Sequence, residues 1–283
     1  SDDISDEDYI DWSNQWLTEL VRITKITGSI FIHNIPKWLA AYNCLLAKMN
    51  VFLKHWIAWD APTSPMGKSL QPAHYGILYY VKDWNNHKFY EIRLPHKRCR
   101  DKYCNQLLKD YGGKKATIHP FGPLVSDVWS DIFRFKHKKY KNDHPCQLPI
   151  HLLERLIIMS TDAGDKVFDP FMGSGTTAIA AKKLDRQYVG IEMSSDYINV
   201  ANKRLAAIKV SSKLNDTYVS CFLNKVQTVR DCDIYDYEAK TFKKSWSDLF
   251  VDWCDTPEKR MKLNIQALEF KPEMKEKILA ICS

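Results

Sequence analysis

Residues 165–194 have the sequence DKVFDPFMGSGTTAIAAKKLDRQYVGIEMS, and this stretch decides the fold. A short apolar strand ends at Asp169, a glycine turn follows over residues 173–175, and a helix then runs from Thr176 to Leu184. The glycines let the backbone turn sharply and approach a ligand, and the helix start offers free N–H groups. In an open parallel sheet, ligands bind beyond the carboxyl ends of the strands. We therefore expect a ligand-binding loop here.

Three classes of ligand compete for this loop. A nucleotide P-loop needs Lys before its Ser or Thr, whereas Thr176 and Thr177 follow the last glycine directly. A dinucleotide site needs a third glycine, which MGSGTTA lacks. S-adenosylmethionine remains, and Glu192 at the end of the next strand supports it, because a carboxylate accepts both ribose hydroxyl hydrogens. Carboxylates at both strand ends, Asp169 and Glu192, argue against a glycine turn that binds no ligand.

The segments that precede this stretch alternate between helical and strand patterns. Apolar residues at helical spacing mark residues 9–23, 38–48 and 148–157, and apolar β runs mark residues 29–35, 51–59 and 75–82. Regularity fades between residues 83 and 128, which we interpret as an inserted region. Alternating strands and helices of these lengths indicate a layered α/β fold.

The net charge of +7 comes from one part of the chain. Residues 86–141 hold 14 Lys and Arg against five Asp and Glu, whereas residues 142–283 hold 20 of each. A basic segment of this kind is a candidate surface for a polyanion, and a solvated basic face with no partner is the alternative.

Several classes of protein are excluded by the composition. The 283 residues contain no apolar run near the roughly 20 residues of a membrane span, and residues 1–11 are acidic where a signal peptide is basic. The eight cysteines form no CxxC pair, and the group His96, Cys99 and Cys104 lacks a second ligand pair for zinc. We expect a soluble intracellular protein without a structural metal.

Two motifs in this sequence resemble those of a known family. DPFMGSGTT (169–177) is similar to the cofactor motif of the DNA amino-methyltransferases, which methylate adenine N6 or cytosine N4. DHPCQLPIHLLERLI (143–157) resembles their companion motif, with Cys146 in place of Thr and Leu148 in place of Lys. The resemblance covers residues 5–82 and 129–207, in the order of the permuted subclass. It implies a doubly wound, mostly parallel α/β sheet of the Rossmann-like methyltransferase type.

The resemblance also implies which residues hold S-adenosylmethionine. The loop would bind the methionine end, Glu192 the ribose, and the companion motif would close over the carboxylate side. Met193 would pack on the adenine, with a simple core position as the alternative. The cofactor-binding residues implied in this way are Asp169, Pro170, Phe171, Met172, Gly173, Ser174, Gly175, Thr176, Glu192, Met193, His144, Pro145 and Gln147.

The family's catalytic motif is absent from these residues. It consists of Asp, Asn or Ser, two prolines and an aromatic that stacks on a flipped base, and it accepts the hydrogens of the amine. The chain has 12 prolines and no two are adjacent. In the permuted subclass the motif precedes a helix like the first one here, so we expect it in a segment before Ser1. The segment QPAHYGILYY resembles the family's base-pocket segment, which makes His74 and Tyr75 pocket candidates; a core aromatic is the alternative for Tyr75.

The basic segment occupies the place of the family's target-recognition region. Phosphate contacts would supply most of the affinity and its salt dependence. The candidate DNA-binding residues are Arg98, Lys114, Lys115, Lys136, Lys138 and Lys139. The expected organisation is a catalytic half over residues 1–85, a target-recognition region over 86–128, a cofactor-binding half over 129–207 and an extension of unassigned role over 208–283.

These features predict a site-specific DNA methyltransferase of bacterial or phage cytoplasm that favours adenine N6. Cytosine N4 is the first alternative, followed by an RNA methyltransferase or a non-catalytic homologue that binds cofactor or DNA. Double-stranded DNA is the expected partner of a monomer or homodimer, with a restriction endonuclease as a potential companion and no membrane.

Overall fold

A computed structural model describes residues 4–61, 70, 72–93, 124–132, 134 and 148–208, and the backbone of residues 229–230, 235–236 and 241–242. The chain divides into two compact units. The first comprises Ser1–Phe89 and Ser126–Val210, and the second comprises Tyr90–Val125 and Ser211–Ser283. In the described part, no helix is long and apolar enough to cross a bilayer.

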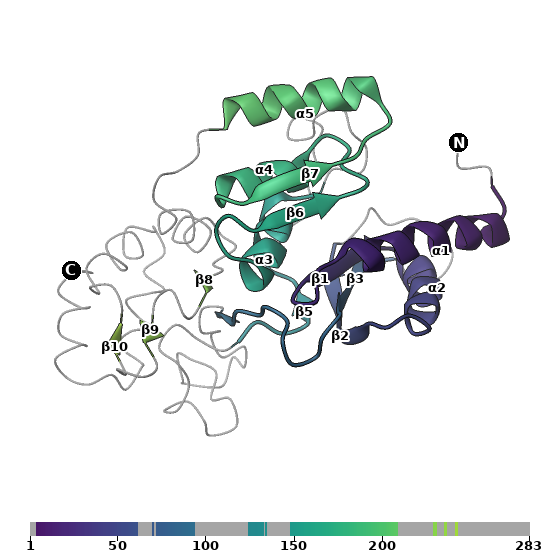
Figure 1. Ribbon diagram of the computed structural model, residues 1–283, viewed down its shortest axis with the longest axis horizontal. Coiled ribbons are helices and arrows are strands. Elements are labelled where there is room, and N and C mark those ends of the chain that lie inside the picture. Colours follow the sequence, from purple (N-terminus) through teal and green to yellow (C-terminus); the bar gives the residue numbers. More distant parts are fainter. Residues whose placement is uncertain are drawn as a thin grey trace. The chain divides into compact units, whose positions relative to one another are not determined.

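A four-stranded sheet forms the first half of unit 1 (Figure 1). Its elements are α1 (Asp6–Ile23), β1 (Ser29–Asn34), α2 (Pro36–Leu46), β2 (Phe52–Asp60), β3 (His74–Val81) and β5 (Val128–Trp129). The strand order is β1-β3-β2-β5. Strand β3 runs antiparallel to both β1 and β2, so these two strands are parallel to each other, and β5 is parallel to β2. The carboxyl ends of β1 and β2 therefore meet at one edge of the sheet.

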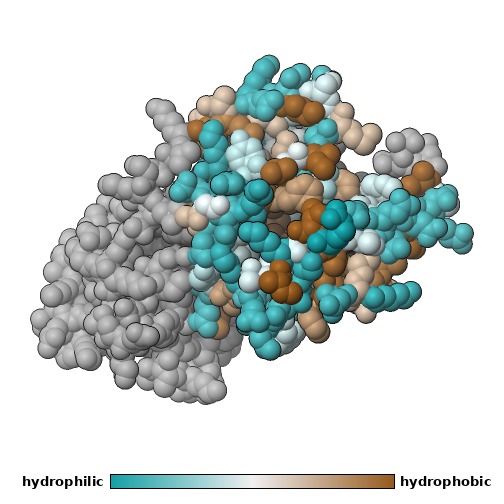
Figure 2. All heavy atoms as spheres, viewed as in Figure 1, coloured by the Kyte–Doolittle hydropathy of each residue, from teal (hydrophilic) through white to brown (hydrophobic). Residues whose placement is uncertain are grey.

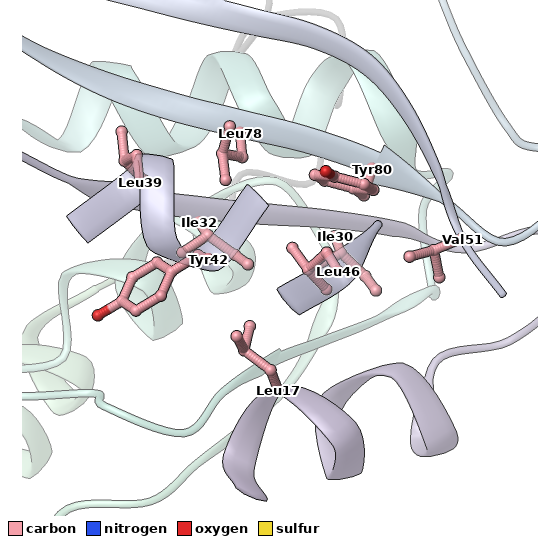
Figure 3. Packing of buried hydrophobic residues seen from close by; sticks show 9 residues of the cluster. All are labelled: Leu17, Ile30, Ile32, Leu39, Tyr42, Leu46, Val51, Leu78 and Tyr80. Carbon is pink, nitrogen blue, oxygen red and sulfur yellow. The ribbon is translucent and has the colours of Figure 1, made fainter. Parts of the chain in front are cut away.

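One face of this sheet carries a core beneath α1 and α2 (Figure 3). Alternation along the strands directs Ile30, Ile32, Leu78 and Tyr80 to this face, where they meet Leu17 of α1. The helix begins where the Ser5 side chain accepts a hydrogen bond from Asp8 N. The opposite alternation places aromatic and histidine side chains on the other face.

A second, two-stranded sheet lies in the other half of unit 1. Its elements are α3 (Ile150–Ser160), β6 (Lys166–Asp169), α4 (Thr176–Lys183), β7 (Gln187–Gly190) and α5 (Ser195–Ala207). Strands β6 and β7 are parallel, with Asp169 opposite Gly190, and α4 packs against both strands and against α3 and α5. Figure 1 shows this strand–helix–strand unit in teal and green.

The described elements agree with the expected alternation, with two differences. The antiparallel β3 makes the four-stranded sheet mixed, where the resemblance implies a mostly parallel sheet. The strand expected to run to Glu192 ends at Gly190, because the Glu192 carboxylate accepts a hydrogen bond from Ser194 N and the chain turns there.

The second unit is described only through short strands. Strand β4 (Ile92–Arg93) pairs antiparallel with β8 (Val229–Arg230), and β9 (Tyr235–Asp236) pairs with β10 (Thr241–Phe242). Val125 N also donates to Ile92 O at 2.8 Å. Residues 94–123, most of the expected target-recognition region, lie outside the described residues.

A buried ion pair joins α3 to α4. The Glu154 side chain is 1% exposed, and its carboxylate lies 2.5 Å from Lys183 Nζ and 2.8 Å from His151 Nδ1. Burial acts to raise the pKa of Glu154, but the hydrogen bond with His151 and the charge of Lys183 outweigh burial and lower the pKa to about 2. The ionised form is therefore the one that stabilises the fold.

We expect Glu154 to make stability depend on pH. Its pKa is lowered from 4.5, so the stabilisation is complete above pH 4.5 and is lost as the pH falls toward about 2. A shift of this size corresponds to about 3 kcal/mol. Urea unfolding at pH 7 and pH 3 should show Glu154→Gln to be less stable than the wild type at pH 7, with the difference reduced to less than about half at pH 3. Glu19→Gln, which breaks an exposed pair with Arg22, is the control and should have a small effect at both pH values.

Candidate functional site

The glycine loop, residues 169–177, connects the carboxyl end of β6 to the start of α4. Gly173 and Gly175 have φ angles of +52° and +81°, a left-handed conformation that favours glycine. Gly175 is also the N-cap of α4, and the first helical hydrogen bond runs from Ile179 N to Gly175 O at 3.0 Å. The N–H groups before Ile179 therefore lie at the open end of the helix, where an anionic group is stabilised.

The Asp169 side chain connects two parts of the glycine loop by hydrogen bonds. Its Oδ1 accepts from Phe171 N at 2.9 Å, and its Oδ2 accepts from Thr177 Oγ1 at 2.5 Å. One carboxylate therefore connects the first turn of the loop to the first turn of α4. This contact agrees with a strand-end position for Asp169 and gives the side chain a role in loop shape.

Glu192 joins the loop from the neighbouring strand. Its Oε2 accepts from Gly173 N at 2.8 Å, and its Oε1 accepts from Ser194 N at 2.9 Å. The backbone supports this contact, because Ile191 N donates to Asp169 O and Met172 N donates to Ile191 O. A carboxylate oxygen has two lone-pair directions, so each oxygen of Glu192 can accept a further hydrogen from a ligand.

Gly190 is a site residue that sequence reasoning missed. A Cβ at this position would lie 2.0 Å from Met172 Sδ and 3.0 Å from Met172 Cβ. The Met172 side chain therefore crosses the end of β7 where only a glycine leaves room. Beyond it, the side chains of Phe171 and Ile191 are about half exposed and Met193 is 98% exposed. A core position for Met193 is thus wrong.

Aromatic residues of α1 reach the loop. The ring centroids of Trp12 and Trp16 lie 5.8 Å and 5.3 Å from that of Phe171. Trp16 also meets Tyr42 of α2 edge to face at 5.5 Å. These contacts join the two halves of unit 1, and the helical spacing of Trp12 and Trp16 had indicated only a buried face.

Arg204 of α5 was also missed. Its Nη1 donates to Ser174 O at 2.5 Å and to Ser174 Oγ at 3.0 Å, and it lies 3.5 Å from Thr176 Oγ1. One turn earlier, Ala201 packs on the loop, since a Cβ at Gly175 would lie 2.7 Å from Ala201 Cβ. A small residue followed three positions later by Arg is the sequence signal, but it is too common to single out this helix.

A second group of site residues lies at the edge where β1 and β2 end. Tyr75 is opposite Trp59 in the sheet, and its ring stacks on His33 at 5.1 Å. Arg134 Cζ lies 5.4 Å from the Tyr75 ring centre. Tyr75 is half-buried and His74 is exposed, so the structure brings Tyr75 together with other rings and leaves His74 at the surface.

His33 is the buried polar group of this edge. Its Nε2 is enclosed and has no hydrogen-bond partner in the described part of the chain. Burial lowers the pKa of His33 to about 4, and the charge of Arg134 acts in the same direction. The imidazole is therefore neutral at pH 7, with one nitrogen able to accept a hydrogen bond.

Comparison with known proteins assigns the family. A model described as DNA methylase, of the N6/N4 class, matches residues 1–203. The chain belongs to the N6/N4 DNA methylase family. The Type II methyltransferase M.BamHI of Bacillus amyloliquefaciens is 39% identical over 229 residues, which cover 78% of this chain and 52% of that protein. M2.DpnII of Streptococcus pneumoniae is 40% identical over 201 residues, covering 71% and 69%. The chain thus spans about half the length of M.BamHI.

Solved structures of methyltransferases share the fold. The PvuII DNA methyltransferase, described as cytosine-N4-specific, superposes with a TM-score of 0.52 at 17% identity and covers 79% of both chains. TTHA0409 of Thermus thermophilus, a putative DNA modification methylase complexed with S-adenosyl-L-methionine, has a TM-score of 0.50 at 22% identity, covering 71% and 77%. The expected Rossmann-like methyltransferase fold and family are confirmed.

Several expected site residues of this chain lie outside the described residues. These are His144, Pro145 and Gln147 of the companion motif and the candidate DNA contacts Arg98, Lys114, Lys115, Lys136, Lys138 and Lys139. Their roles stay predictions. The same holds for His96, Cys99 and Cys104, and within the described ranges no group of three or more His, Cys, Asp or Glu is placed to hold a metal.

Proposed function

We propose that this protein transfers a methyl group from S-adenosylmethionine to the exocyclic amine of a base in double-stranded DNA, with adenine N6 as the acceptor. The observation that supports this function most directly is the contact between Glu192 Oε2 and Gly173 N. It joins the glycine loop to the expected ribose carboxylate of the next strand, in a chain that belongs to the N6/N4 DNA methylase family. The choice of adenine over cytosine rests on how common adenine-N6 enzymes are in the family that the sequence resembles.

The described residues fit the cofactor. S-adenosylmethionine supplies an electrophilic methyl group on a sulfonium centre. The open N-terminus of α4 would hold its carboxylate, and Glu192, whose two oxygens each keep a lone pair, would accept the ribose hydroxyls. Phe171 and the exposed Met193 supply apolar surface beside these groups for the adenine. Figure 2 shows hydrophobic residues interrupting a mainly hydrophilic face of the described part.

The ring group at the sheet edge fits the acceptor base. Tyr75 is half-buried, its ring stacks on the neutral His33, and Arg134 places a cation over the Tyr75 ring. A base extruded from the duplex is read by stacking and by hydrogen bonds to its edge. We therefore assign Tyr75, with His74 beside it, to the base pocket, and we assign His33 to the support of the Tyr75 ring on which it stacks.

Methyl transfer can be tested directly on the full-length protein with labelled S-adenosylmethionine, unmethylated bacterial DNA and RNA. Label in DNA that digests to N6-methyladenine is the expected result, and N4-methylcytosine would move the acceptor to cytosine. Label in RNA alone would indicate an RNA methyltransferase. Cofactor binding without transfer to either nucleic acid would indicate a non-catalytic homologue.

The basic residues before the companion motif predict a specific salt dependence. Neutralising Lys136, Lys138 and Lys139 together, by substitution with Gln, should weaken binding to duplex DNA. Removing three phosphate interactions should reduce the slope of log K against log salt by about 2.7. Titrations between 50 and 200 mM salt measure this slope. Lys25, Lys48 and Lys54, changed to Gln on unit 1, are the matched control, and equal slopes for the two triple variants would remove the assignment.

Partners and setting complete the proposal. The relatives are bacterial Type II methyltransferases, which supports a bacterial or phage setting and a cytoplasmic location. A companion restriction endonuclease, a monomeric or homodimeric state and the permuted motif order are predictions of the same kind. The boundaries at residues 85, 128 and 207 likewise stay a proposal.

A further inference from the structure

We propose that Arg204 is a positioning residue for the glycine loop and controls cofactor affinity without touching the cofactor. The guanidinium donates to Ser174 O and Ser174 Oγ and lies 3.5 Å from Thr176 Oγ1. These contacts come from α5, a helix outside the cofactor motif and the companion motif. The inference rests on the proposed cofactor, and it concerns only the shape of the loop.

The groups that accept hydrogen bonds from Arg204 are buried, so Arg204 takes the place of water as their donor. Ser174 and Thr176 are 4% and 7% exposed, and both flank Gly175, the left-handed residue at the start of α4. A buried carbonyl or hydroxyl that loses its donor destabilises the conformation that buries it. The loop conformation with its N–H groups at the open end of α4 is therefore stabilised by Arg204.

The charge of Arg204 adds to this effect. Burial lowers the pKa of Arg204, and in the described part of the chain no carboxylate forms an ion pair with it. An arginine stays protonated even so, because its usual pKa lies far above neutral pH. This positive charge lies beside the turn at the N-terminus of α4. The charge and the helix N-terminus both make the electrostatic potential there more positive, which favours binding of a carboxylate.

Helix α5 is itself anchored at the other end of the site. Its N-cap residue Ser194 accepts from Tyr197 N through its side chain and donates its own N–H to Glu192. Near the other end, Lys182 Nζ of α4 donates to Leu205 O at 2.8 Å. One helix thus contacts Glu192 through its start and Ser174 through Arg204. Rotation of α5 would move both groups together.

The effect on binding follows from the hydrogen bonds that each substitution removes. Arg204→Met keeps the aliphatic stem and removes the donors and the charge, so we expect S-adenosylmethionine to bind about 10- to 50-fold more weakly. Arg204→Lys keeps the charge and a donor nitrogen but has a shorter side chain without the planar guanidinium, so its affinity should lie between those of the wild type and Arg204→Met. The adjacent Lys203 is exposed, and Lys203→Met is the matched control.

Isothermal titration of the 283-residue chain with S-adenosylmethionine tests this order of affinities. Wild type and Lys203→Met should agree within twofold, Arg204→Lys should be weaker, and Arg204→Met weakest. If the wild type does not bind S-adenosylmethionine, the cofactor proposal fails. If the wild type binds and Arg204→Met binds within twofold of Lys203→Met, only the role of Arg204 is overturned.

A cofactor-free readout separates loop positioning from general stability. In ¹H–¹⁵N spectra, Arg204→Lys should shift the amide signals of Gly173 and Gly175 while leaving those of the distant β3 unchanged. Arg204→Lys retains a cation and a long side chain, so the proposal can still be tested with this variant if Arg204→Met does not fold. Unchanged glycine signals, or shifts spread equally over unit 1, would overturn the proposal.

Discussion

Glu192→Gln is expected to weaken S-adenosylmethionine binding about 100-fold or more, because hydrogen bonds to a charged group contribute about 1.5–3 kcal/mol each. Glu192 accepts from Gly173 N and Ser194 N, one bond for each oxygen. An amide has one oxygen, so Gln keeps one of these bonds at most and turns an NH₂ group toward the other donor. The same change replaces one of the two acceptors for the ribose hydroxyls by a donor.

The measurement is the dissociation constant of S-adenosylmethionine, with Asp196→Asn as the control. Asp196 is an exposed carboxylate in the first turn of α5, four residues away, so its loss changes the charge without touching the loop. Glu192 is only partly buried, and the folded state of Glu192→Gln should therefore persist. Affinity within threefold of the control would show that the Glu192 carboxylate does not contact the cofactor.

The loop itself could be predicted from the sequence because its determinants are local. Gly173 and Gly175 form the sharp turn that their pattern indicated, and Asp169 and Glu192 lie at the end of the sheet where the two parallel strands finish. Each of these features depends on residues that are close together in the sequence. Such local features can be predicted without knowledge of the fold.

The supports of the loop could not be predicted, because they join residues far apart in the chain. Trp12 and Trp16 contact Phe171, which lies more than 150 residues later in the chain. Arg204 binds Ser174 from another helix, 30 residues away in the sequence. Nothing in the helical spacing of Trp12 or in a single arginine specifies such a partner. Gly190 was missed for the same reason, since its need for glycine arises from the Met172 side chain.

The group of rings around Tyr75, where β1 and β2 end, could be predicted only in part. Resemblance to a pocket segment indicated Tyr75, and the sheet register then placed it beside Trp59 and His33. His33 has no motif of its own. Its enclosed Nε2 and its lowered pKa arise from packing against rings from neighbouring strands, so only the folded sheet reveals it.

Gly175→Ala should be the most damaging small substitution in the loop. At φ +81° an L-residue is strained, which costs about 1–2 kcal/mol. The added Cβ would also lie 2.7 Å from Ala201 Cβ and 3.3 Å from Ala201 Cα, so α5 must move, and overpacking of this kind costs about 1–3 kcal/mol more. Since α5 also holds Ser174 through Arg204, we expect loss of cofactor binding together with the lower stability.

Gly164 offers a matched control for this substitution. Its φ is +79°, nearly that of Gly175, but a Cβ there would meet nothing within 4 Å. Gly164→Ala therefore carries the backbone strain alone and should leave S-adenosylmethionine binding intact. Urea unfolding of the two variants isolates the steric contribution of Ala201 as the difference between them, about 1–3 kcal/mol. Equal stabilities and equal affinities would mean that α5 does not press on the loop and that its distance from Gly175 can relax freely.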